Sequence, residues 1–266
     1  MRVKNLISAA CLVLLFAAHD AQAQGVQNVD QFATLTNSLM ADYYKAPANT
    51  NVPGLLKTFE LSAASRINDS YPPVIGFMAG LFIKYPDQIS AFIPEKPSPL
   101  IQNIIAAGLG LAGHPSEIKR YGALWGWSDA TIAQRSEGPA LLAMPANSAT
   151  DFDLNWGASY ATGEGRFVRK IVDAYARTAE RKDIDVEDIV KLTIAIDNPS
   201  DTATIQKVLG KYSQQDKLSV VLASTALKFL KANARQHGFV ATTLQQVEVE
   251  NPTSKAMTGW RAYMAQ

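Results

Sequence analysis

Two acidic side chains near the middle of the chain, Asp153 and Glu164, are of the right type for general acid–base chemistry. Both lie near a bend that we predict at Gly163, where one helix ends and the next begins. Two carboxyl groups held over a cleft can protonate a leaving group and activate water, as in many hydrolases. No catalytic signature motif accompanies these two residues in the sequence. The catalytic residues therefore stay unknown, and an envelope hydrolase that uses carboxylates is the alternative function.

Basic side chains follow the same bend and could bind a partner. Asp173 lies four residues from both Arg169 and Arg177, a spacing that favours a solvated helix face with ion pairs. The alternative is a surface patch that binds an acidic partner or a cell-wall polymer. The residues of this basic run are Arg166, Arg169, Lys170, Arg177, Arg181 and Lys182.

Aromatic side chains precede the bend. Phe152, Trp156 and Tyr160 recur every four residues, so they line one face of a predicted helix. Tryptophans, including Trp125 and Trp127, can stack on sugars or peptides, but aromatic residues at helical spacing are more often core. The candidate residues for binding a ligand or partner are Trp156, Tyr160, Glu164, Arg166, Arg169 and Lys170.

The segment 108–113 matches the G-x-G-x-x-G pattern of dinucleotide-binding proteins. In those proteins a helix begins at the glycines and continues, whereas here His114 and Pro115 interrupt the pattern at once. No βαβ pattern surrounds the segment. We therefore predict that its small residues let two helices approach closely, and we predict no cofactor.

The acidic segment 183–188 resembles the start of a calcium-binding loop. The sixth position of such a loop needs glycine and the twelfth needs glutamate, but the chain has Asp188 and Ile194 there. We predict instead that Asp185 caps a helix. Only two histidines and no cysteine follow residue 23, so we predict no metal site.

The first 23 residues have the pattern of a signal peptide. Arg2 and Lys4 are basic, residues 6–18 are apolar, and residues 21–23 read Ala-Gln-Ala, which fits a cleavage site after Ala23. Cys11 could belong to a lipoprotein signal, but the apolar run continues past it. We therefore expect a periplasmic or secreted protein without a transmembrane segment in the mature chain.

The expected mature chain is electrically neutral. The whole chain carries 25 basic and 24 acidic residues, and cleavage after Ala23 removes Arg2, Lys4 and Asp20. A neutral protein has no long-range field to attract nucleic acid, so we exclude that class of partner.

Hydrophobic periodicity predicts an all-α protein without a substantial sheet. We expect an irregular, superhelix-like array of antiparallel helical hairpins, because helical patterns fill most of the chain and strand signals are nearly absent. The apolar run 74–83 is too short to span a membrane and predicts a helix buried on all sides. Residues 24–266 form either one helical domain or two halves joined by a connection at 128–149, where the pattern weakens.

The stretch around the bend reads Phe152-Asp153-Leu154, then W-G-x-x-x-A-T-G over residues 156–163, then a basic amphipathic helix over 166–175. This combination resembles a group of uncharacterised exported bacterial helical proteins, and the likeness extends from about residue 141 to residue 249. The resemblance implies a helical fold with a helix–bend–helix unit at Gly163. It carries no assigned chemistry.

These patterns favour an exported helical protein with a non-enzymatic interaction or scaffold role in the cell envelope. A neutral charge, many helices and no catalytic signature are typical of proteins that bind in grooves between helical hairpins. The expected partner is another envelope or extracellular protein.

Overall fold

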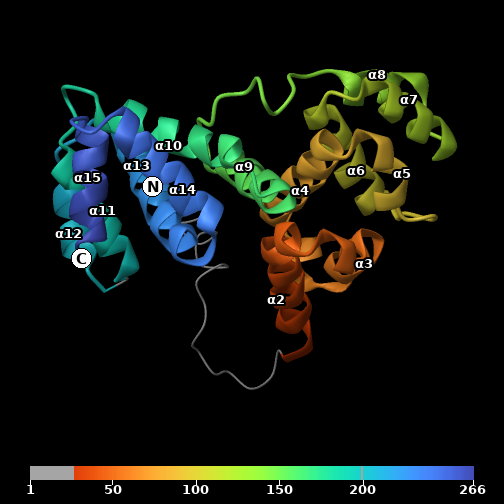
Figure 1. Cartoon of the computed structure of the whole chain (residues 1–266), viewed down its shortest axis with the longest axis horizontal. Coiled ribbons are helices and arrows are strands. Elements are labelled where there is room, and N and C mark those ends of the chain that lie inside the picture. The colour runs from red at the N-terminus through yellow and green to blue at the C-terminus, as the bar shows by residue number, and fades with distance from the viewer. Residues whose placement is uncertain (1–26, 199) are drawn as a thin grey trace, which may run out of the picture. The chain divides into compact units, whose positions relative to one another are not determined.

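The computed structural model describes residues 27–198 and 200–266, and every regular element in these ranges is a helix (Figure 1). The prediction of an all-α fold without a substantial sheet is therefore confirmed for the described residues. The predicted signal peptide and Cys11 lie outside them.

The chain divides into two compact units. The described part of unit 1 comprises residues 27–144 and 153–163, and that of unit 2 comprises 145–152, 164–198 and 200–266. Unit 1 contains α2 (Gln27–Asp42), α3 (Val52–Leu61), α4 (Tyr71–Lys84), α5 (Ile89–Phe92), α6 (Pro99–Ala112), α7 (Pro115–Leu124) and α8 (Asp129–Ser136). Unit 2 contains α10 (Gly165–Ala179), α11 (Val186–Asp197), α12 (Thr202–Leu209), α13 (Gln214–Gln236), α14 (Gly238–Glu250) and α15 (Lys255–Met264). The helix α9 (Ala149–Thr162) begins in unit 2 and lies mostly in unit 1.

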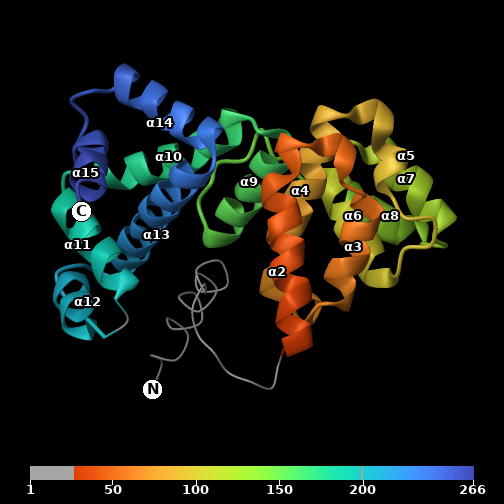
Figure 2. The same cartoon turned by 60° about the horizontal axis from the view of Figure 1, so that its bottom comes forward.

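Helix α4 is the centre of unit 1. It begins with two prolines after Tyr71, which the first turn of a helix accepts, and residues 76–82 are all buried. Helix α6 packs along α4, α7 packs on α6, and α8 packs on both α6 and α7 (Figures 1 and 2). The prediction of a helix buried on all sides is thus confirmed. In the described part of the chain, no helix is both long and apolar enough to cross a bilayer.

Small residues let α4 pack directly against α9. A Cβ atom added at Gly76 would lie 2.0 Å from the carbonyl oxygen of Leu154, and one at Gly157 would lie 2.0 Å from that of Pro73. One turn further along α4, a Cβ atom at Gly80 would lie 2.8 Å from Cα of Ala158. Since these neighbours are backbone atoms, only glycine fits at this crossing.

The glycines of the segment 108–113 also serve helix packing. Helix α6 runs through Gly108 and ends at Gly113, which has a left-handed φ of 78°. A Cβ atom at Gly108 would lie 2.9 Å from Cβ of Met78 in α4. The prediction of close helix approach is confirmed here.

In unit 2, α13 packs against α10, α11 and α14. The buried face of α10 contains the predicted residues Phe167, Val168, Ile171, Val172 and Tyr175. The C-terminal helix α15 is fixed by two hydrogen bonds. The Tyr175 hydroxyl donates to the carbonyl oxygen of Ala256 at 2.8 Å, and the Lys231 ammonium donates to that of Tyr263 at 2.9 Å.

The segment 128–149 contains regular structure that its sequence pattern did not indicate. Ser128 caps α8 by accepting a hydrogen bond from the amide of Thr131, and the helix continues to Ser136. It has no fully buried residue, so its hydrophobic periodicity is weak. Packing on α6 and α7 stabilises it instead.

Candidate functional site

Residues of the W-G-x-x-x-A-T-G motif pack against, and form hydrogen bonds with, other residues of the protein. Trp156 is only 6% exposed, and its ring stacks on that of Tyr160 with centroids 6.1 Å apart. The Thr162 hydroxyl donates to the carbonyl oxygen of Ala158 at 2.8 Å, and the Thr162 carbonyl accepts a hydrogen bond from Lys84. These contacts, together with the crossing at Gly157, assign the motif to the core of unit 1.

Gly163 ends α9 in the left-handed conformation that we predicted, with φ of 69°. A Cβ atom there would also lie 2.9 Å from the ring of Tyr44. Both the backbone conformation and the covering ring therefore require glycine at the bend.

Asp153 has the most unusual carboxyl group of this region. Burial, together with the smaller effect of the negative charge of Asp69, raises its pKa to about 7. Asp153 belongs to unit 1 and Glu164 to unit 2.

The substitution Asp153→Asn should stabilise the fold at neutral and higher pH. The unfolded chain releases the proton near the usual aspartate pKa of 3.8 and the native state near 7, so native stability falls as pH rises across this interval. Three pKa units correspond to at most about 4 kcal/mol, and residual solvent contact lowers the expected gain to about 2 kcal/mol. Urea unfolding at pH 4 and pH 8 measures it. An equal change in stability at both pH values would contradict a raised pKa at Asp153. The same gain in stability from Asp87→Asn, at an exposed aspartate, would also contradict it.

Two arginines of α10 form ion pairs. Arg166 pairs with Glu164, and Arg169 pairs with Asp173 at 3.1 Å and with Glu250 at 2.6 Å. Burial lowers the pKa of Lys170. The predicted pair of Arg169 with Asp173 is confirmed. Arg177 instead donates hydrogen bonds to the backbone carbonyl of Ala146 and to the side-chain oxygen of Asn147. The candidates Trp156 and Tyr160 belong to unit 1, and the other four belong to unit 2.

The acidic segment at the start of α11 is also structural. Asp185 caps the helix by accepting a hydrogen bond from the amide of Glu187 at 2.9 Å, as predicted. The buried Asp188 carboxylate accepts hydrogen bonds from Lys211 and from the Tyr212 hydroxyl, which lower its pKa. Within residues 27–198 and 200–266, no group of three or more potential metal ligands occurs.

An aromatic cluster at the end of α7 reaches from the buried Tyr121 to the exposed Leu124. Tyr121 stacks on Trp125 with ring centroids 5.6 Å apart, and Trp125 meets Trp127 edge-on at 5.2 Å. The Trp127 indole donates to the Gln102 side chain at 3.2 Å. Neither tryptophan is fully buried, and the neighbouring Leu124 is 73% exposed. We call Tyr121, Leu124, Trp125 and Trp127 the α7 cluster.

Two arginines and a tight turn support the α7 cluster. The Arg120 guanidinium lies 4.5 Å from the Tyr121 ring, and that of Arg135 lies 5.8 Å from the Trp127 ring. Gly126 adopts a left-handed φ of 74° in the turn. A Cβ atom at Gly122 would collide with Ile132 of α8 at 2.8 Å, so glycine sets the spacing of the two helices. The sequence left two roles open for these tryptophans, stacking on a ligand or packing in the core.

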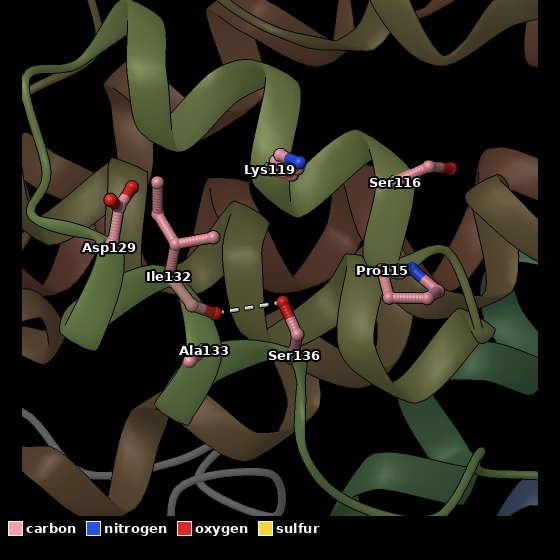
Figure 3. Close-up of a pocket in the computed structure, with 7 residues that line it drawn as sticks. All are labelled: Pro115, Ser116, Lys119, Asp129, Ile132, Ala133 and Ser136. Carbon is pink, nitrogen blue, oxygen red and sulfur yellow. Dashed lines mark hydrogen bonds between the residues drawn. The ribbon is translucent and has the colours of Figure 1, made fainter.

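A pocket of about 550 Å³ opens between α7 and α8 (Figure 3). Both helices contribute charged, hydroxyl and apolar side chains to it. Its lining residues are Pro115, Ser116, Lys119, Asp129, Ile132, Ala133 and Ser136. The Ser136 hydroxyl donates to the backbone carbonyl of Ile132 at 2.7 Å. Lys119 and Asp129 are the charged groups of the lining, and Ser116 adds a hydroxyl.

The fold and these sites define an all-helical protein with two units, an aromatic surface cluster and a small adjacent pocket. No family model, no curated protein and no solved structure matches the chain.

Proposed function

We propose that this protein is an exported, non-enzymatic interaction protein of the cell envelope, which binds another protein through the α7 cluster. The observation that carries the proposal is the exposure of Leu124 beside partly exposed Trp125 and Trp127. The proposal of export rests on the signal-peptide pattern of residues 1–23. The likeness to exported helical proteins through the W-G-x-x-x-A-T-G motif supports the same class.

The composition of the α7 cluster supports protein binding. Tryptophan, tyrosine and arginine dominate the residues that carry most of the free energy in protein interfaces, because they combine large contact areas with polar groups. Covering an exposed leucine contributes about 1.5–3 kcal/mol. The stacked rings and their arginine neighbours already hold one another in place, so little side-chain entropy is lost on binding.

The pairing of the α10 arginines favours the α7 cluster over the basic run as the binding surface. An acidic partner would have to displace Glu164 from Arg166 and both Asp173 and Glu250 from Arg169. Exchange of one ion pair for another yields little net free energy at an exposed surface.

The second candidate function is a hydrolase, and one observation favours it. A carboxyl group whose pKa is raised to about 7, near a second acid, has the properties of a general acid. Asp153 would supply the proton and Asp69 the negative charge. Asp153→Asn separates the candidates: a hydrolase loses its activity, whereas a binding protein gains stability and keeps its partner.

Photo-crosslinking from position 124 tests the proposed function. A photoreactive amino acid that replaces Leu124 should capture one discrete envelope protein in growing cells, since this side chain would lie inside the interface. Ile194, which is 40% exposed in unit 2, provides the matched control position. Equal capture of the same protein from both positions would contradict the proposal.

A further inference from the structure

The pocket between α7 and α8 has features of a ligand site that neither the motif nor the α7 cluster explains. Helix α7 begins at Pro115, directly after His114, and α8 begins at Asp129 after its cap Ser128. Gly122 has no side chain, so Ile132 of α8 can approach α7 closely at one end of the pair. The pocket extends along the preceding turn of α7, from Lys119 back to Pro115.

Opposite charges face this pocket from the two helices. Lys119 extends from α7 and Asp129 stands at the start of α8, while the Ile132 side chain is seen between them (Figure 3). In the described part of the chain, neither Lys119 nor Asp129 has an ion-pair partner. Both charges are therefore available to a ligand.

The arrangement selects for a ligand with both charges. Lys119 would attract an anion, but Asp129 would repel it. A cation would be attracted by Asp129 and repelled by Lys119. A molecule with a carboxylate at one end and an ammonium at the other satisfies both groups. Between them, Ile132, Ala133 and Pro115 offer apolar contact to a short side chain. A volume of about 550 Å³ lies within the usual range for small-ligand sites.

We propose that the α7–α8 pocket binds a short peptide with free amino and carboxyl termini, its carboxylate on Lys119 and its ammonium on Asp129. This site goes beyond the proposed function, because it recognises a small molecule beside the surface that would bind a protein. Both charged groups are exposed, so the affinity should be modest, with Kd of roughly 1 mM.

The test uses the tripeptide Ala-Leu-Ala with free termini, and the same peptide acetylated at its N-terminus or amidated at its C-terminus. Binding to the full chain is followed by amide chemical shifts in NMR titrations. The free peptide should shift amides of α7 and α8 saturably. Each cap should weaken binding about twofold to fivefold, as expected for loss of one exposed charge pair.

Two variants assign each charge. In Lys119→Gln, the affinity for the free peptide should fall to that for the amidated peptide, and the affinity for the amidated peptide should not change. In Asp129→Asn, the affinity for the free peptide should fall to that for the acetylated peptide, and the affinity for the acetylated peptide should not change. Lys207→Gln, at an exposed lysine of α12, is the matched control and should change nothing.

Three results would overturn the proposal. These are equal affinities for free and capped peptides, saturable shifts confined to other helices, and no saturable shift of any amide. None of these results would change the crosslink expected from position 124. Failure of the peptide site and failure of the proposed function are therefore distinguishable.

Discussion

Gly157→Ala should destabilise the protein by at least about 3 kcal/mol. A single added methyl group would lie 2.0 Å from the carbonyl oxygen of Pro73 and 2.6 Å from the amide nitrogen of Phe77. Both are backbone atoms of α4, so no side-chain rotation relieves the collision. The two helices must separate, and the buried contacts along α4 are lost with them.

Urea denaturation followed by circular dichroism measures this change, and Gly238→Ala provides the control. Gly238 begins α14, and nothing lies within 4 Å of an added Cβ atom there. Alanine at that position should leave stability unchanged or raise it slightly, because it reduces the entropy of the unfolded chain. Equal stability of the two variants would mean that α4 and α9 do not cross as closely as described.

Trp156→Ala should cost about 3–5 kcal/mol, because it leaves a large cavity in the core of unit 1. Trp156 is 6% exposed and packs against Tyr160, and its indole nitrogen has no hydrogen-bond partner among the described residues. Loss of the ring therefore removes apolar contact and no hydrogen bond. The thermal midpoint should fall by about 10 °C.

Trp125→Ala is the matched comparison, since it removes the same side chain from the half-buried α7 cluster. We expect a loss of about 1 kcal/mol or less and a normally folded protein. An unchanged midpoint for Trp156→Ala would contradict its place in the core and make it a candidate for ligand stacking. A fall as large for Trp125→Ala would mean that the α7 cluster supports the fold rather than a partner.

Elements with strong local patterns could be predicted from the sequence. The apolar face of α10 and the uniformly apolar α4 were both predicted from periodicity and composition. Gly163 ends a periodic segment and adopts the expected left-handed conformation. In each case the information lies within one or two helical turns, which is the range over which sequence patterns report structure.

Features that depend on distant contacts could not be predicted. Gly157 needs to be glycine because of Pro73, which lies 84 positions earlier and has no local link to it. The short helix α8 lacks a buried stripe of its own. The exposure of Trp125 depends on which elements cover α7, whereas its spacing resembles that of a core residue. The raised pKa of Asp153 likewise requires the packing that buries it.

The binding role of the α7 cluster is the central claim, and the crosslink from position 124 tests it most directly when the Trp125→Ala substitution is added. Trp125 neighbours Leu124 and stacks on Tyr121, so its loss should remove the captured protein while the fold remains intact. The paired substitution Lys207→Gln should leave the crosslink unchanged. We predict a crosslink yield at least about fivefold lower in the Trp125→Ala background, as expected for loss of an interface hot spot. An unchanged yield from a folded Trp125→Ala protein would contradict the assignment of this surface as the site of partner binding.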